Sequence, residues 1–312
     1  MPTTGGRQAG HTVVAYIGID TVALPKRDKA AYATKSTFRA ETTRGPQPPP
    51  PPPPQPRVPG ATIASGRCCR GWRIRVAVTK VLVCLANSYK HRGRCVAGIE
   101  IEPTGPFALP RNRATWIRPV SDRAGHAVNE QERRYRDGDE PQVLDVVSVV
   151  LVKHQPYGFQ RENWLLDSAS RWQKVRRIGW DELCLLEQRP SSLWINGYNS
   201  YSGINDRVPF EREHEVKSSL KLIRVDEVNI EVEPPSPYSK DGRPSVRARF
   251  RFAGADYSLK VTDAVQRGKF RAKGLGEYRL GESFVTVSIA EKFADGYIYK
   301  VVAGMVDCGD RK

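Results

Sequence analysis

The sequence predicts an all-β fold with minor helix, behind an N-terminal segment that has no regular structure. Two observations predict the strands. Arg247, Arg249 and Arg251 alternate with apolar residues over Ser245–Phe252, which is the two-residue period of a strand. Short runs of β-branched residues also recur between turn residues from residue 220 to residue 305. Even spacing of this kind is typical of small β-barrels or β-sandwiches. The third observation is a proline-rich start without periodicity.

Residues 1–76 are predicted to be a disordered, basic arm. Pro48 to Pro54 form an unbroken run that favours polyproline II and cannot join a sheet. Residues 1–77 carry twelve Lys and Arg against three Asp and Glu. Three interpretations stay open: an arm that tethers nucleic acid, a proline-rich ligand for another domain, or a start assigned too early, with the true start near Val76 or Val78.

The net charge of the whole chain favours polyanion binding more strongly than the charge of the part predicted to be folded does. The chain has a formal net charge of +16, but residues 78–312 carry 38 cationic against 31 acidic side chains. Six cysteines are spread thinly, no secretory segment is present, and the most apolar stretch, Val146 to Val152, which is interrupted by Ser148, is too short to span a bilayer. We therefore expect reduced thiols, a cytoplasmic location and no membrane association.

A first group of strands is expected before residue 215. Residues 124–142 read as a charged, partly helical excursion, Asp181–Gln188 as a short amphipathic helix, and Trp194–Pro209 as a polar loop. The strands predicted in this group are Lys80–Leu85, Arg94–Ile101, Thr115–Val120 and Asp145–Val152.

A second group of strands follows a boundary placed near residues 210–219. Pro234 and Asp241-Gly242 mark turns within it. The domains are accordingly predicted as 77–215 and 216–308. The strands predicted in the second group are Leu220–Val225, Val228–Val232, Val246–Phe252, Tyr257–Val261, Ser283–Ile289 and Ile298–Met305.

Several short motifs, in order from about residue 80 to residue 306, resemble those of the dual OB-domain proteins, a bacterial family. The matching stretches begin at Val81 (VLVCLANS), Lys90 (KHRGRCVAG), Trp116 (WIRPVS), Leu144 (LDVV), Gln160 (QREN), Leu259 (LKVTD), Val287 (VSIAEKF) and Tyr299 (YKVVAG). The resemblance implies two OB-like Greek-key barrels and, by analogy of fold, nucleic-acid binding, with a role in defence against phage as one expectation. It supplies no catalytic residues.

The first candidate binding surface is the arginine face of the strand Ser245–Phe252. OB barrels hold single strands on their second and third strands, where basic and aromatic side chains track the backbone. Arg247, Arg249 and Arg251 would contact phosphates there. The alternative is a solvated sheet face whose arginines pair with Asp or Glu on neighbouring strands.

Two further clusters combine cations with aromatic residues or glycine. The stretch from Gln266 to Arg279 is expected to be a flexible loop suited to phosphate contact and base stacking, or simply a solubilising loop. Its candidate residues are Arg267, Lys269, Phe270, Arg271 and Lys273. Lys90, Arg92 and Arg94 occupy the turn between the first two strands, which in an OB barrel borders the ligand groove.

The loop Trp194–Arg207 mixes rigid aromatic residues with amides, which suits contact surfaces of any kind. Its candidate recognition residues are Trp194, Tyr198, Tyr201, Asn205 and Arg207. The alternative is core packing for Trp194 and a structural role for the rest. Four other tryptophans read mainly as core: Trp116, Trp164, Trp172 and Trp180.

No catalytic or metal-binding motif is complete. Cys84, His91 and Cys95 lie close in sequence, but no Cys-x-x-Cys is present and a fourth ligand is missing. The glycine spacing of Gly93 to Gly98 lacks the Lys and Ser/Thr of a P-loop, and no Gly-x-Ser-x-Gly occurs. We expect no metal and no cofactor.

The sequence thus predicts a non-catalytic module that binds nucleic acid, with single strands favoured, and that acts as an accessory or sensor beside an effector protein. One alternative is a module that recognises a protein or a small nucleotide through the Trp194–Arg207 loop. Another is an unrecognised metal-dependent nuclease. The oligomeric state is not indicated.

Overall fold

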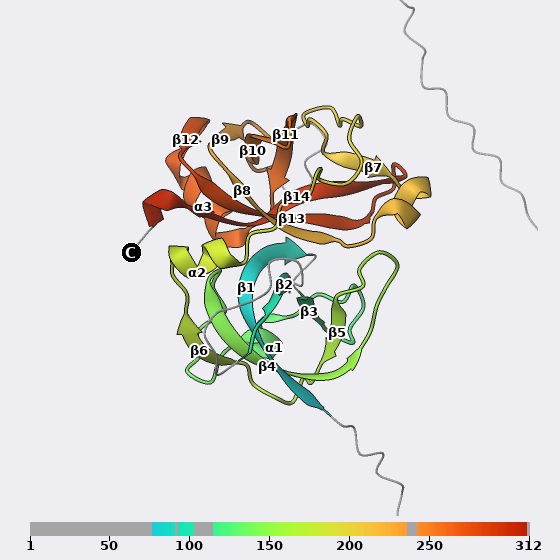
Figure 1. Ribbon diagram of the computed structural model, residues 1–312, viewed down its shortest axis with the longest axis vertical. Coiled ribbons are helices and arrows are strands. Elements are labelled where there is room, and N and C mark those ends of the chain that lie inside the picture. Colours follow the sequence, from blue (N-terminus) through green and yellow to red (C-terminus); the bar gives the residue numbers. More distant parts are fainter. Residues whose placement is uncertain (1–76, 91–92, 103–114, 236–241, 311–312) are drawn as a thin grey trace, which may run out of the picture. The chain divides into compact units, whose positions relative to one another are not determined.

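The computed structural model describes residues 77–90, 93–102, 115–235 and 242–310 (Figure 1). These residues form two β-sheets and a few short helices, so the predicted all-β class is confirmed. The predicted N-terminal arm, Arg92 and His91 lie outside the described residues.

The first sheet closes into a five-stranded barrel. Its strand order is β1-β2-β3-β5-β4, and β4 pairs again with β1. The long strand β1 makes closure possible because its first half pairs with β4 and its second half with β2. β3 and β5 are parallel, whereas the other pairs are antiparallel. The elements are β1 (Val78–Lys90), β2 (Gly93–Glu100), β3 (Trp116–Val120), α1 (Glu130–Arg133), β4 (Asp145–His154), β5 (Asn163–Leu166) and, outside the barrel on β4, β6 (Gln173–Arg177).

The second sheet follows the same route, with its first strand broken in two. β8 (Leu220–Val225) pairs with β13 (Ser283–Lys292), and β9 (Val228–Glu233) pairs with β10 (Ser245–Phe252), so that β8 and β9 together take the place of β1. β11 (Ala255–Val261) and β14 (Tyr297–Asp307) form the parallel pair. The remaining elements are α2 (Trp180–Leu185), β7 (Arg207–Pro209), a 3₁₀ turn (Phe210–Glu215), α3 (Ala264–Lys273), β12 (Gly276–Leu280) and a final 3₁₀ turn (Cys308–Asp310).

In both barrels a helix follows the third strand, α1 in the first and α3 in the second. The order, the parallel pair and the position of the helix are those of an OB barrel. Ala253 and Gly254 join β10 to β11 with positive φ values of 48° and 79°, as a two-residue turn between twisted strands requires.

Alternate residues of the barrel strands enter separate cores. Leu82, Cys84 and Val147 lie in the interior of the first barrel, and Ile223, Val285 and Val302 in that of the second. Their sequence neighbours, including Val83 and Phe284, belong to a third cluster that joins the barrels. This arrangement explains why a strand such as Lys80–Leu85 is apolar on both faces, because each face packs in a different core.

The two barrels meet closely along β1 and β14. A Cβ atom placed on Gly304 would lie 2.1 Å from the carbonyl oxygen of Leu85, so only glycine allows this approach. Around it, Leu220, Leu222 and Phe284 of the second barrel pack in one cluster with Trp116 and other residues of the first. Near the end of β1, the Tyr89 backbone N–H donates to the Thr262 carbonyl at 2.9 Å.

Most predicted strands are present, but the sequence interpretation missed β5, β6, β7 and β12 and was wrong about one loop. The stretch from Gln266, predicted as a flexible loop, is α3 followed by β12. Signals for the helix exist in the sequence. The Asp263 side chain accepts hydrogen bonds from the Val265 and Gln266 backbone N–H groups, and Gly274 ends the helix with φ 95°.

Candidate functional site

The face of an OB barrel that usually holds ligand is buried in the first barrel. That face is formed by the second and third strands, here β2 and β3. Ala97, Ile99 and Trp116 point from it into the cluster shared with the second barrel, and each is at most 8 % exposed. The first barrel therefore uses its ligand strands to hold the second.

A buried polar network sits at this contact. The Arg118 guanidinium, 2 % exposed, lies 2.9 Å from the Glu162 carboxylate and donates to the hydroxyl oxygens of Ser219 and Ser288 at 2.9 and 3.3 Å. Ser219 in turn donates to Glu162. Because the two serines belong to the second barrel, this ion pair links the barrels as well as closing the face.

The corresponding face of the second barrel, on β10 and β11, does carry the three predicted arginines, but Arg247 is not exposed. It is 4 % exposed and pairs with Asp206 at 3.0 Å. Its guanidinium also donates to the Ser258 hydroxyl and carbonyl oxygens at 3.1 and 2.6 Å. The segment that contains Asp206 and Ile204 runs along β11 and bonds to Ser258, so it covers this end of the face.

Arg249 and Arg251 are exposed, and both face carboxylates. Arg249 pairs with Glu231 at 2.7 Å and Arg251 with Asp256 at 3.3 Å. This is the charge pairing that the sequence left open as the alternative. Whether the face binds phosphate stays a prediction.

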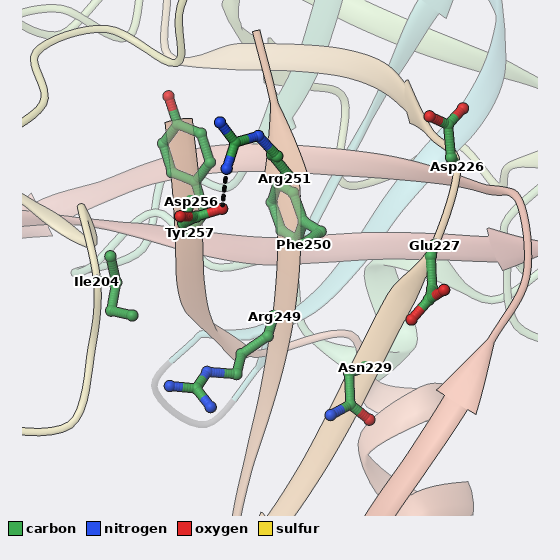
Figure 2. A pocket seen from close by; sticks show the side chains of 9 residues that line it. All are labelled: Ile204, Asp226, Glu227, Asn229, Arg249, Phe250, Arg251, Asp256 and Tyr257. Carbon is green, nitrogen blue, oxygen red and sulfur yellow. Dashed lines mark hydrogen bonds and ion pairs between the residues drawn. The ribbon is translucent and has the colours of Figure 1, made fainter. Parts of the chain in front are cut away.

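A cleft of about 500 Å³ lies beside these two arginines. Figure 2 shows Arg251 directed at Asp256, with Asp226 and Glu227 on the bend between β8 and β9. Three carboxylates thus face two guanidiniums in the lining. Because carboxylates outnumber guanidiniums in its lining, this cleft is poorly suited to binding a polyanion.

The predicted recognition loop is braced by its own hydrogen bonds. The Trp194 indole is partly buried and donates to the Ser218 carbonyl at 2.6 Å, and the Asn205 amide bonds the backbone of Gly197 and Asp256 at 2.6 and 2.9 Å. Tyr201 is 87 % exposed.

Other contacts hold the same loop to the barrel. The Arg207 guanidinium lies over the Tyr297 ring at 4.0 Å, and the Tyr198 hydroxyl accepts from Arg212 at 3.4 Å. Beneath the loop, the buried Lys300 donates to the Ile195 carbonyl at 2.7 Å, and burial lowers the pKa of this lysine to about 7. The loop is therefore part of the second barrel's structure.

The cationic stretch predicted in α3 has a definite geometry. Phe270 is fully buried in the second core, so it is not available to stack on bases as predicted. Lys269 and Lys273 are exposed, and Arg271 donates to the Pro244 carbonyl at 2.8 Å. The helix contains four cationic residues and no acidic one.

The two cationic clusters predicted separately from sequence meet at the junction of the barrels. Arg94 of β2 and Arg267 of α3 lie over the ring of Tyr89, at 3.9 and 4.1 Å from its centroid. Tyr89 is 45 % exposed at the end of β1. Lys90 beside it pairs with Glu291 of β13 at 2.6 Å.

The two arginines lower the pKa of Tyr89 below the ordinary tyrosine value. The largest cause is a hydrogen bond donated by Arg94 to the phenol oxygen, and the charge of Arg267 adds to it. The sequence alone does not predict this contact, because Tyr89 and Arg267 are far apart in the chain and belong to different barrels.

Cys84, considered above as a metal ligand, lies inside the first barrel, where burial raises the pKa of its thiol far above the usual range. Among the described residues, no three His, Cys, Asp or Glu side chains cluster as metal ligands do. Within the same residues, no helix has the length and apolar character needed to cross a bilayer.

Comparison with known proteins agrees with the barrel topology. No curated protein and no solved structure matches the chain. A family model described as the dual OB-containing domain matches residues 80–305, which spans both barrels and most of the chain. The fold and family fit a module of the nucleic-acid-binding type. The chain belongs to the dual OB-containing domain family.

Proposed function

We propose that this protein binds single-stranded nucleic acid, without cleaving it, along a surface at the junction of the barrels. This junction surface consists of Tyr89 and Arg94 from the first barrel and Arg267 from the second. Lys90, which pairs with Glu291, lies beside it in the chain. The observation that carries the proposal is the stack of Arg94 and Arg267 on the half-exposed ring of Tyr89.

The stack joins the two kinds of contact that single strands need. Guanidinium groups neutralise phosphates, and their planes also accept stacked bases, as aromatic rings do. An unpaired strand exposes both its phosphates and its base faces, whereas a duplex exposes mainly phosphates. The junction surface therefore favours single strands.

The position of the surface agrees with the burial of the barrel faces. The usual ligand face of the first barrel is closed, and that of the second is lined by ion pairs. Helix α3, by contrast, contains four cationic residues and no acidic one, and its Arg267 lies over Tyr89 near the end of β1. Of the other three, Lys269 lies 3.9 Å from Asp307. An accessory role, in which a partner protein supplies any enzymatic activity, follows from this proposal of binding without catalysis.

The test is fluorescence anisotropy of the full chain with labelled single-stranded DNA, duplex DNA and single-stranded RNA. We expect single strands to bind more tightly than duplex, with a log–log salt slope of roughly −3 to −4 if four to six phosphates are contacted. The double variant Arg94→Gln/Arg267→Gln should lose about 50- to 100-fold in affinity near 0.1 M salt, and its salt slope should be shallower by about 2.

A matched control removes the same charge from the other arginine surface. The variant Arg249→Gln/Arg251→Gln should keep its affinity within about threefold, since those arginines already face carboxylates. Circular dichroism must show that both variants are folded. Equal losses of affinity in the two variants would mean that net charge alone determines binding. That result would contradict binding at the junction surface.

A further inference from the structure

A second cleft, of about 520 Å³, opens between the two barrels. One wall comes from the end of β1, the segment before β4 and the connection from β6 to α2. The other comes from the start of α3 and the end of β14. Its volume is in the range of small-molecule sites, which often lie between domains.

Two buried side chains in the lining have an acceptor without a partner. Asn87 is 5 % exposed and its amide nitrogen donates to the Pro141 carbonyl at 2.7 Å, but its Oδ1 accepts no hydrogen bond. Gln266 is 7 % exposed and its Nε2 donates to the Met305 carbonyl at 3.2 Å, while its Oε1 accepts none.

These two orphaned acceptors require an explanation. A buried polar atom without a partner is costly, and folded proteins leave few of them. Each amide nitrogen already bonds to a carbonyl, which fixes the orientation of the amide and leaves the oxygen as the unused group. Both residues line one cleft, and both oxygens are covered in the free protein, so a small movement of the two side chains would let a single ligand with N–H donors satisfy both.

The rest of the lining indicates what else that ligand carries. Asp263, also in the lining, already accepts three backbone N–H groups, and burial raises its pKa to about 6. Apolar side chains such as Ile178 and Val306, and the Trp180 indole, suit a flat ring. Arg177, with a half-exposed side chain that also pairs with Asp145 at 3.0 Å, supplies a cation at the solvent side.

We propose that the inter-barrel cleft binds a purine mononucleotide, whose base donates hydrogen bonds to Asn87 and Gln266 and whose phosphate meets Arg177. Guanine fits best, because it presents a ring N–H and an amino group on one edge. Uracil offers a single ring N–H and is expected to bind more weakly. This inference uses residues outside the junction surface and stands whether or not that surface binds nucleic acid.

The test is thermal unfolding and calorimetric titration of the full chain with guanosine, adenosine and uridine monophosphates. Guanosine monophosphate is expected to bind most tightly and to raise the melting temperature by about 3–5 °C at roughly ten times its Kd. No shift with any of the three, or equal shifts with all of them, would overturn the proposal.

Variants separate this cleft from other surfaces. Val265 lines the cleft and is 54 % exposed, so Val265→Trp should obstruct the cleft without disturbing a core. Leu275→Trp, at a similarly exposed residue outside the lining, is the matched control. We expect loss of guanosine monophosphate binding only in the first. Binding that survives Val265→Trp but is lost in Arg94→Gln/Arg267→Gln would assign the nucleotide to the junction surface and overturn the proposal.

Gln266→Leu gives an independent readout that needs no ligand. It removes an acceptor that has no partner, so the unfolding temperature of the free protein should change little or rise, while the shift caused by guanosine monophosphate should disappear. If the variant keeps the full ligand shift, Gln266 is not a ligand residue and the proposed mode of binding is wrong.

Discussion

Strand β10 and helix α3 belong to the same barrel and both carry cationic side chains, yet their arginines contact different partners. On β10, Arg247, Arg249 and Arg251 each pair with a carboxylate from the adjacent strands or from the loop before β7. In helix α3, Lys269 also lies 3.9 Å from a carboxylate, that of Asp307, but Arg267 lies over the ring of Tyr89 of the other barrel. A row of arginines in sequence therefore does not by itself identify a binding surface, because the cross-strand partners decide the local charge.

The arginines of β10 also differ among themselves in burial, and this gives the largest expected effect. Replacing Arg247 by Met would leave the Asp206 carboxylate, 4 % exposed, without its cation. We expect the free energy of unfolding to fall by about 3–5 kcal/mol. Arg249→Met breaks an exposed pair and should cost about 0–1 kcal/mol. Urea denaturation of the two variants measures both values.

A second substitution tests the cause of that loss. If the uncompensated charge is responsible, Asp206→Asn added to Arg247→Met should recover part of the lost stability. Similar losses for Arg247→Met and Arg249→Met would contradict the view that one arginine is structural and the other is not.

The carboxylates next to the two regions differ as well, which leads to a pH-dependent prediction. Asp263, at the start of α3, is 2 % exposed and burial raises its pKa from 3.8 to about 6, against the opposing effect of three backbone hydrogen bonds. A carboxyl with a raised pKa in the folded state stabilises the fold below its unfolded pKa. That stability is lost as the pH rises through about 6, by about 3 kcal/mol for a shift of this size.

Urea denaturation of the native chain and of Asp263→Asn, between pH 4 and pH 7, isolates this contribution. Across that interval, the unfolding free energy of the native chain should decrease by about 3 kcal/mol relative to that of the variant. A difference that stays constant with pH would mean that Asp263 titrates normally. Asp256→Asn, at an exposed carboxyl on the β10 face, serves as the matched control.

The strands could be predicted from the sequence because their signal is local. The alternation of Val246, Ala248 and Phe250 with arginines correctly places these residues in the barrel interior. Successive apolar residues from Val81 to Leu85 likewise mark a strand with both faces covered. Local periodicity is sufficient for conclusions of this kind.

The candidate site could not be predicted in the same way, since it depends on contacts between distant segments. Arg247 is buried because Asp206, in a separate loop, folds onto β11. Arg94 and Arg267 meet on Tyr89 only because the barrels pack together at Gly304. Helix α3 was within reach of sequence reasoning through Asp263 and Gly274, but its dense positive charge resembles that of a solvated loop.

The smallest expected effect comes from removing the negative charges next to the exposed arginines of β10. Glu231→Gln with Asp256→Asn would remove the carboxylates that face Arg249 and Arg251, while keeping side chains of similar shape. The β10 face would then carry uncompensated guanidiniums, and affinity for single-stranded DNA at low salt should rise by about three- to tenfold. The gain should disappear at high salt, because it rests on exposed charges.

Fluorescence anisotropy at two salt concentrations measures this gain in affinity. Glu277→Gln, on the neighbouring strand β12, is the control for the loss of negative charge alone. An unchanged affinity would show that paired carboxylates are not what separates the two arginine surfaces, and the difference would then have to lie in the Tyr89 stack.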